Sequence, residues 1–444
     1  MPAAARRRIH LAGFLIAGNG AHSHALWRHP LTETGFLTAP YYQEIARSLE
    51  RGLFDLVFFA DRLAMSSRYG GSIEVGARHG DQDATRLDPL PTLGVMAGAT
   101  SRIGLGATRS TTYARPYSLA REFATLDHLS AGRAAWNVVT SVNQGEADNF
   151  GVENRLGHDE RYDAADEFME LAFSLWDSWA PDALVLDREG GIYADPAKVR
   201  PVDFEGRHQR SRGPLNIPRS PQGRPVIIQA GSSVRGQDFA ARWAEVVFSI
   251  QPDRDRMRRF RDDLRDRAER QGRPRDEVKV LTAVMPFVAA SRAEAEALRD
   301  EHNALVHPIV GLSTLSSHMD FDFSSLPHDA PLAELEVGGM RGLFDVVRRL
   351  SAEGATLADI GGLYGQSVLV PQLVGTAADV ADQLAGLFEA EACDGFVVTP
   401  AHLPRGFDDF VAGVVPELQR RGLFRTAYAG STLREHLRDR DGPP

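Results

Sequence analysis

Eight short segments of the chain are almost continuously apolar, and longer segments with a helical spacing of apolar residues lie between them. Continuous apolar runs indicate strands buried on both faces, as in a parallel sheet covered by helices. The predicted strands are 9–17, 55–60, 102–108, 134–140, 225–230, 245–250, 279–289 and 395–399. The predicted helices are 41–51, 91–100, 118–128, 161–179, 238–244, 253–271, 292–306 and 377–392.

This alternation of eight strands with helices predicts a (β/α)8 TIM barrel, and we expect residues 1–444 to form one barrel domain. The alternative is an open, doubly wound sheet, which would carry a phosphate-binding glycine fingerprint after its first strand. The first predicted strand is followed by GNGAHSHALW, which has no G-x-G-x-x-G. The barrel is therefore the preferred fold.

Three segments do not fit the minimal alternation and are interpreted as long loop insertions, at about 63–88, 181–224 and 307–371. The first is polar and rich in glycine, the second is rich in Pro, Asp and Arg, and the third contains a helical pattern at 342–353. Loops of this length in a compact domain usually act as lids or binding elements. We expect at least one of them to cover the active site.

Charge and cysteine content narrow the range of partners and compartments. The formal net charge is −10, whereas nucleic acids and acidic membranes are bound by basic surfaces, so neither is expected as a partner. The single cysteine, Cys393, excludes an internal disulfide and lies in an apolar setting typical of a buried, inert thiol. The run 9–17 lacks a signal-peptide cleavage site, and no run approaches the ~20 apolar residues of a membrane helix. We expect a cytoplasmic protein.

The chemistry of such a barrel lies at the carboxyl ends of its strands. Thr140 and Ser141 close the fourth strand, and the next helix begins near His158. His158 and Tyr162 are four residues apart, so their side chains share one face of its first turn. Together with the free N–H groups at the start of the helix, this arrangement predicts an anion-binding site. An ordinary strand–helix unit with two half-buried polar residues would give the same pattern.

A second candidate anion-binding site follows the fifth strand, in the turn QAGSSVRG. Its glycine lets the backbone approach a ligand, and Ser232 and Ser233 can cap the following helix, which would also explain them without a ligand. Asp61 ends the second strand and could act as a general base, accept a hydrogen bond from a ligand or pair with Arg62.

The H-x-H motif formed by His22 and His24 is a candidate metal site. Metal-dependent barrels of this type also need histidine and aspartate ligands at later strand ends, where this chain offers only His402, so no metal is expected. The sequence also has no P-loop and no G-x-S-x-G nucleophile elbow.

Longer stretches of the chain resemble one known family. They are RIGLGATRSTTYARPYSLAREFATLDHLSAGRAAWNVVTS, ADNFG, RYDAADEFMELAFSLWDSW, PVIIQAGSS, VGTAADVADQL, DGFVVTP and VVPELQRRGLFRTAYAGSTLREHL. These segments are similar to the flavin-dependent monooxygenases of the nitrilotriacetate monooxygenase and dibenzothiophene-sulfone monooxygenase group, in the bacterial-luciferase-like superfamily. The likeness covers nearly the whole chain and weakens at 65–88 and 307–371, where substrate selection is expected.

The resemblance implies a luciferase-like barrel that binds reduced FMN (FMNH2) delivered by a separate NAD(P)H:FMN reductase. Reduced FMN would react with O2 to give a flavin C4a-hydroperoxide, which oxidises a small sulfur- or nitrogen-containing molecule, including xenobiotics, while the protein keeps water away. Family members commonly associate, so a homo-oligomer, either dimer or tetramer, is expected. The missing dinucleotide fingerprint agrees with a separate reductase.

Six positions match the flavin site of this family. They are Asp61, Thr108, His158, Tyr162, Ser232 and Ser233. The last four coincide with the two candidate anion-binding sites and would hold the FMN phosphate. Asp61 and Thr108 would lie towards the flavin ring or the ribityl chain. The acid–base residues are unknown, with His24, Asn137 and His402 as candidates.

Two alternatives to the monooxygenase remain open. An F420-dependent oxidoreductase of the same superfamily would transfer hydride without O2. A non-catalytic flavin-binding protein would hold flavin without turnover, although long lid-like insertions speak against it. The sequence leaves the substrate and the oxidised atom undetermined.

Overall fold

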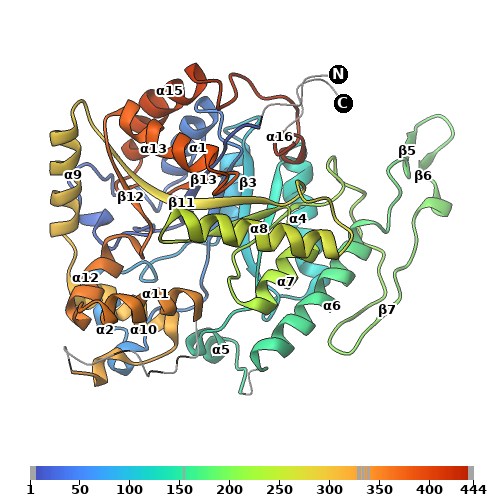
Figure 1. Ribbon diagram of the computed structural model, residues 1–444. Helices are drawn as coiled ribbons and strands as arrows, with labels where there is room; N and C mark the ends of the chain where they lie inside the picture. Colours follow the sequence, from blue (N-terminus) through green and yellow to red (C-terminus); the bar gives the residue numbers. More distant parts are fainter. Residues whose placement is uncertain are drawn as a thin grey trace.

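The computed structural model describes residues 7–153, 156–327 and 341–438, together with 332, 335 and 337. Eight parallel strands close into a barrel in which β10 pairs with β11 and β13 pairs with β1 (Figure 1). In barrel order they are β1 (His10–Ile16), β2 (Leu56–Ala60), β3 (Gly104–Ser110), β4 (Ala134–Val139), β9 (Val226–Gln229), β10 (Val246–Ser249), β11 (Lys279–Val288) and β13 (Gly395–Val398). The predicted (β/α)8 barrel is confirmed, and each predicted strand lies within two residues of an observed one.

Each predicted helix is also present around the barrel (Figure 1). They are α1 (Ala39–Arg51), α3 (Pro89–Ala97), α4 (Pro116–Leu129), α6 (His158–Trp176), α7 (Val234–Trp243), α8 (Arg254–Arg270), α9 (Arg292–Ala304) and α13 (Ala377–Glu389). The helical segment after β13 was not predicted. It is split into α14 (Arg405–Asp409), the π-helical η5 (Phe410–Val414) and α15 (Val415–Arg420), so no long 3.6-residue period marks it in the sequence.

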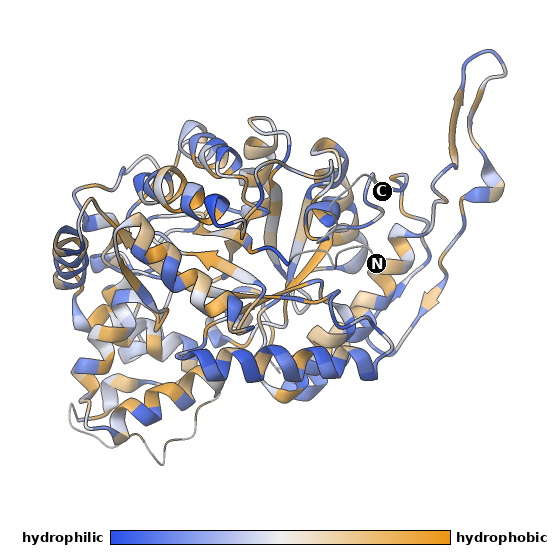
Figure 2. Cartoon of the chain, turned by 45° about the horizontal axis from the view of Figure 1, so that its top comes forward, coloured by the Kyte–Doolittle hydropathy of each residue, from blue (hydrophilic) through white to orange (hydrophobic). Residues whose placement is uncertain are grey.

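The barrel strands are largely apolar because both of their faces are covered. All seven residues of β1 are buried, as are nine of the ten in β11. Figure 2 shows these apolar strands at the centre, with helices of mixed polarity around them. Cys393 is fully buried, and burial raises the pKa of its thiol to about 12, which confirms the prediction of an inert side chain.

The third insertion forms a helical unit with its own core. It contains α10 (Pro308–Met319), α11 (Arg341–Ala352) and α12 (Leu357–Ser367), packed through Leu315, Phe344 and Tyr364. The predicted helical stretch 342–353 corresponds to α11, whereas α10 and α12 were not predicted. The first insertion carries α2 (Glu74–His79), which packs against α10.

The second insertion forms a projecting arm (Figures 1 and 2). It consists of two antiparallel ribbons, β5 (Leu184–Asp187) with β6 (Ile192–Ala194) and β7 (Phe204–Glu205) with β8 (Arg210–Ser211). Its side chains do not line the cavity at the end of the barrel. Among the described residues, no helix combines the length and apolar character that crossing a membrane requires.

Candidate functional site

A cavity of about 290 Å³ lies at the carboxyl ends of the barrel strands. Its floor comes from β1, β2, β3, β4, β9 and β10, and its walls include the loops that follow several of these strands. The first insertion contributes Gln82 and Arg86, and the third contributes His318, Leu343 and Val368. Two of the three insertions thus cover this end of the barrel, as expected for lids.

Thr108 and Asn137 form a hydrogen-bonded polar pair in the lining of the cavity. The Thr108 hydroxyl donates to the carbonyl of Phe59 at 2.8 Å, and the Asn137 amide nitrogen donates to the Thr108 oxygen at 2.8 Å. The amide oxygen of Asn137 is buried and has no partner within the described part of the protein. Buried polar atoms are usually satisfied, so this oxygen is available to a donor on a ligand.

Tyr162 and Gly231 form a second polar region, where α6 begins beside the turn after β9. The Tyr162 side chain is buried, which raises the pKa of its hydroxyl, and hydrogen bonds with Ser233 and Thr140 partly offset this effect. A Cβ atom at Gly231 would lie 2.4 Å from the Gln229 amide nitrogen and 3.0 Å from the Tyr162 oxygen. Only glycine allows this close approach.

Four of the six predicted flavin residues lie at or beside the cavity, and the other two lie farther from it. Asp61, Thr108 and Tyr162 line the cavity. The Ser233 hydroxyl caps α7 by accepting from the Gly236 amide at 3.1 Å, and Ser233 also contacts Tyr162.

The other two predicted residues lie farther out. His158 begins α6 with its ring 5.3 Å from that of Tyr162, but its Nδ1 lies 2.6 Å from Asp159 and it does not line the cavity. Ser232 is exposed, and its carbonyl accepts from the Gln237 side chain at 2.9 Å.

Asp61 directly follows β2, and its carboxyl group is largely buried beside the guanidinium groups of Arg86 and Arg109. Burial raises the pKa of its carboxyl group to about 6, and the charges of Arg86 and Arg109 offset only part of this rise. One carboxylate oxygen accepts from the Arg62 backbone at 2.9 Å, and the other is 3.8 Å from the Arg109 guanidinium. Asp61 can therefore exchange a proton near neutral pH.

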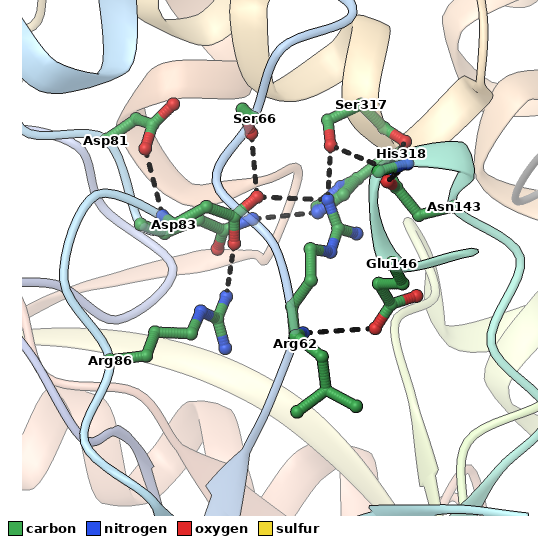
Figure 3. Close-up of polar contacts among 12 residues, drawn as sticks. Arg62, Ser66, Asp81, Asp83, Arg86, Asn143, Glu146, Ser317 and His318 are labelled. Atoms are coloured by element: carbon green, nitrogen blue, oxygen red, sulfur yellow. Dashed lines mark hydrogen bonds and ion pairs between the residues drawn. The ribbon is translucent and has the colours of Figure 1, made fainter. Parts of the chain in front are cut away.

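A buried ionic network that the sequence pattern did not reveal lies beside this cavity (Figure 3). Asp83 pairs with Arg62 at 3.0 Å and with Arg86 at 2.6 Å, and it accepts from the Ser66 hydroxyl at 2.7 Å. The two guanidinium groups hold the pKa of Asp83 well below its usual range. The dense charge in HGDQDATR within a glycine-rich loop was the available signal.

The same network attaches the third insertion to the barrel (Figure 3). Arg62 donates to the Ser317 hydroxyl, and Asn143 donates to it at 3.1 Å. His318 bonds to Gln82 at 2.7 Å and to the Tyr364 hydroxyl. Burial lowers the pKa of His318 well below its usual value, so its ring is neutral and can hold one partner on each nitrogen.

The two histidines of the H-x-H motif, His22 and His24, lie in different surroundings. His22 lines the cavity with its ring 4.0 Å from Phe14, whereas His24 is buried outside the lining and His402 stacks on His29 at 5.0 Å. Burial lowers the pKa of His22 to about 3 and that of His24 to about 4. In the described ranges, no group of three or more His, Cys, Asp or Glu side chains is placed to hold a metal ion.

A larger apolar groove of about 790 Å³ lies on the outside of the barrel, between α3 and α4. Leu90, Leu126 and Leu129 line it, and Arg109 lies at its edge. Of its lining residues, Arg109 alone belongs to a barrel strand, whereas six barrel strands contribute to the lining of the smaller cavity. We therefore place the functional site in the smaller cavity.

The cavity suits an elongated ligand with three chemically different parts. The Tyr162 region lies beside the amino ends of α6 and α7, which favours a phosphate. The unpaired Asn137 oxygen suits a hydroxyl or ring N–H donor, and Phe14, Phe58 and Phe248 offer an apolar surface to a ring system. Flavin mononucleotide has these three parts in this order.

Comparisons with known proteins identify the family of this chain. The model of the family described as luciferase-like monooxygenase matches residues 18–393. The dibenzothiophene-sulfone monooxygenase of Rhodococcus erythropolis (strain XP) is 49% identical over 442 residues, covering 97% of this chain and 97% of that protein. Nitrilotriacetate monooxygenase component A of Aminobacter aminovorans is 41% identical over 435 residues, covering 96% and 95%.

A solved structure shows the same architecture. The crystal structure of riboflavin lyase with modified FMN and riboflavin has a TM-score of 0.89 at 34% identity, covering 97% of this chain and 96% of that one. The family model and both relatives extend over most of the chain. The chain therefore belongs to the luciferase-like monooxygenases and is a flavin-dependent monooxygenase.

Proposed function

We propose that this protein is the oxygenase of a two-component system, which takes FMNH2 from a separate NAD(P)H:FMN reductase and uses O2 to oxygenate a small organic molecule that contains sulfur or nitrogen. The observation that carries the proposal is the covered cavity with its polar Tyr162 region, its unpaired Asn137 oxygen and its apolar wall. The names of the two relatives, a sulfone monooxygenase and a component A, support the substrate chemistry and the division into components.

In this proposal the phosphate of FMN binds where α6 and α7 begin. Tyr162 and Ser233 donate hydrogen bonds to it, Ser232 offers its exposed hydroxyl, and His158 lies at the rim. Thr108 and Asp61 lie towards the ribityl chain and the ring, together with Asn137. When bound, reduced FMN supplies the activation of O2.

The two covering insertions exclude water from the reacting groups. Gln82, Arg86 and His318 enclose the cavity from the side opposite the barrel, and the Asp83 network fixes their positions. Water would otherwise divert O2 reduction to hydrogen peroxide. The carboxyl group of Asp61 is suited to hold or release a proton at this site, because burial has moved its pKa to about 6.

We further propose that the protein acts in the cytoplasm as a homo-oligomer, either a dimer or a tetramer. A buried free cysteine and a diffusible reduced flavin both fit a reducing compartment. The arm carries Leu186, Ile192 and Tyr193 on its exposed surface, with relative exposures of 57%, 48% and 66%. A second copy of the chain would cover these apolar side chains.

The first test of this function is FMN binding by a Tyr162→Phe variant. Loss of a hydrogen bond to a charged phosphate costs about 1.5–3 kcal/mol, so we expect the dissociation constant to rise at least about tenfold. Anaerobic titration with FMNH2, followed by flavin absorbance and fluorescence, measures it. Tyr193→Phe, on the exposed arm, is the control and should bind like the wild type.

Turnover is measured separately, by mixing FMNH2-loaded protein with oxygenated buffer and candidate sulfides, sulfones and amines. Oxygenated product formed at the expense of hydrogen peroxide supports the monooxygenase. Flavin binding with hydrogen peroxide as the sole product supports the non-catalytic alternative, and preferential binding of F420 over FMN supports the hydride-transferring one.

A further inference from the structure

A second hollow, of about 380 Å³, lies directly beside the cavity. Asp61, Arg62 and Arg86 line both hollows, so these residues lie between the two spaces. The remaining lining of the second hollow comes from 63–65, 83–84, 87–88 and Arg109. We call this second hollow the side chamber.

Arg109 connects the buried carboxyl group of Asp61 with an exposed one at the edge of the side chamber. One guanidinium nitrogen of Arg109 lies 3.8 Å from Asp61, and another lies 2.7 Å from both carboxylate oxygens of Asp88. The Asp61 side chain is 9% exposed, whereas that of Asp88 is 49% exposed. Glu122 is 3.8 Å from the same guanidinium, and the second oxygen of Asp61 accepts from the Arg62 backbone at 2.9 Å. The side chamber therefore leads from Asp61 towards solvent.

The side-chain charges that face Asp61 come from three elements. Arg109 lies on β3, Arg86 lies in the first insertion, and Asp88 precedes α3. Each guanidinium makes a shorter contact with another carboxylate, Arg86 with Asp83 at 2.6 Å (Figure 3) and Arg109 with Asp88 at 2.7 Å. Burial raises the pKa of Asp61 to about 6, so its protonated and ionised forms are both present near neutral pH.

The proposed reaction needs a proton whenever the reduced flavin enters as its anion, FMNH−. In FMNH− + O2 + S + H+ → FMN + SO + H2O, the flavin gives two electrons to O2, one oxygen atom goes to the substrate S and the other leaves as water. Without substrate the same proton is consumed in FMNH− + O2 + H+ → FMN + H2O2. Because the two covering insertions exclude bulk water, this proton has to reach the cavity through a group in its wall.

We propose that Asp61 passes this proton from the side chamber to the cavity, and that the Arg109–Asp88 pair controls the transfer. The O–H bond of the Asp61 carboxyl group breaks as its proton moves to the reacting oxygen, and a proton from solvent, carried by water in the side chamber, forms the bond again. Arg109 and Asp88 do not line the cavity, so they are positioning residues that act through Asp61. This inference rests on the proposed oxygenase function and adds the route of its proton.

The first test measures the titration of Asp61 directly. Infrared spectra of the protein with oxidised FMN bound are recorded as a function of pH, and subtraction of the Asp61→Asn spectra isolates the band of the protonated Asp61 carboxyl group. Arg109→Gln removes a positive charge near Asp61, so the midpoint should rise by at least about half a pH unit. Asp88→Asn removes a negative charge and frees Arg109 for Asp61, so the midpoint should fall by at least about half a pH unit.

The two variants have matched controls. Asn at position 88 can still cap α3, as Asp88 does now. Asp382→Asn and Arg421→Gln break another partly exposed ion pair, of 2.6 Å, whose residues line neither the cavity nor the side chamber. Both should leave the midpoint of Asp61 at the wild-type value. An unchanged midpoint in Arg109→Gln and Asp88→Asn, or a shift in the same direction in both, overturns the role of the pair.

The transfer itself is measured by mixing FMNH2-loaded protein with oxygenated buffer and following flavin reoxidation and hydrogen peroxide release. The rate should fall as pH rises through the infrared midpoint of each protein, so the profile moves up in Arg109→Gln and down in Asp88→Asn. A profile that does not follow the midpoint overturns Asp61 as the proton donor.

The side chamber is tested by filling it. Ala84 and Met65 line it from two segments and do not line the cavity. Ala84→Trp and Met65→Trp should each slow the reaction at least about fivefold, because they displace the water that returns the proton. The infrared midpoint of Asp61 and the affinity for FMN should stay as in the wild type. A wild-type rate in both variants overturns the route through the side chamber.

Failure of the proposed function has a different signature. In that case the midpoint of Asp61 still shifts in opposite directions in the two variants, but hydrogen peroxide is the sole product with every candidate sulfide, sulfone and amine. If oxygenated product forms while its rate ignores the midpoint of Asp61, the function stands and the proton route falls.

Discussion

Asp81 and Asp83 are two residues apart in the first insertion, yet their carboxyl groups have opposite electrostatic surroundings. Asp83 lies between the guanidinium groups of Arg62 and Arg86, which hold its pKa well below the usual range. Burial and the neighbouring charge of Asp83 raise the pKa of Asp81 to about 6. One Asp81 oxygen accepts from the Asp83 backbone at 2.9 Å, and the other has no partner among the described residues.

Substitution of Asp83 by Asn should strongly destabilise the protein. The change leaves two buried guanidinium groups without their counterion, which typically costs about 3–5 kcal/mol. We expect a clearly lower thermal midpoint at pH 8, together with more hydrogen peroxide per FMNH2 consumed, because Arg62 and Arg86 no longer hold the lid. An unchanged midpoint would contradict the role of Asp83 as the centre of the network.

Asp81→Asn is the matched control, and at pH 8 it should raise the stability of the folded protein instead of lowering it. The pKa of Asp81 is raised in the folded state, so its ionisation costs stability as pH rises from about 4 to above 6. Asn keeps the acceptor for the Asp83 amide and cannot ionise. The variant should therefore match the wild type below pH 4 and be more stable at pH 8, by on the order of 1–3 kcal/mol. Thermal melts across this pH range measure the difference.

At the scale of elements, the third insertion depends on a close helix crossing. A Cβ atom at Gly311 in α10 would lie 1.8 Å from the Gly361 carbonyl oxygen in α12. The backbone of Gly365, also in α12, accepts from the His24 amide at 2.9 Å and so attaches this unit to the loop after β1. Glycine weakens a helix by itself, but here it lets two helices approach and close the lid.

Gly311→Ala should separate α10 from α12, because the added methyl group has no space. Overpacking of this kind costs about 1–3 kcal/mol. We expect faster hydrogen exchange in both helices with unchanged exchange in the barrel strands. Gly362→Ala is the control, since its Cβ would meet no atom within 4 Å, and it should protect α12 slightly by improving helix propensity. Equal exchange in the two variants would argue against the crossing.

The whole molecule combines a closed barrel with an arm that projects from it. Closure of the strands removes every barrel edge, so the body does not need a partner to satisfy its backbone. The arm differs, because a two-stranded ribbon with exposed apolar residues is marginal in water by itself. Among the described parts of the molecule, the exposed apolar residues of the arm would gain the most stability from burial against a second copy of the chain.

The double variant Val185→Lys, Tyr193→Lys should therefore lower the oligomeric mass. Two charges on the apolar face of the arm would be buried without partners if a second copy covered it. Light scattering after gel filtration measures the mass, and Glu189→Lys, in the turn of the same hairpin, is the control for added charge. A wild-type mass for the double variant would place the interface elsewhere, for example at the groove between α3 and α4.

The sequence by itself determined the barrel, because parallel strands buried on both faces must be continuously apolar and their helices must be amphipathic. It also identified Asp61, Thr108 and Tyr162, which line the cavity, since strand ends and helix starts converge at one end of any such barrel. That these three residues, together with His158, Ser232 and Ser233, contact FMN remains a prediction.

Only the tertiary structure decided which lids cover the site and how its charges are balanced. Arg62 bonds to Asp83, 21 residues away, and to Ser317, 255 residues away, and no local period in the sequence records such contacts. The same holds for the stacked rings of Phe14 and Phe248, because both are ordinary strand residues in sequence and meet only when the barrel closes. Local spacing fixes elements, whereas contacts between distant segments fix the chemistry that those elements enclose.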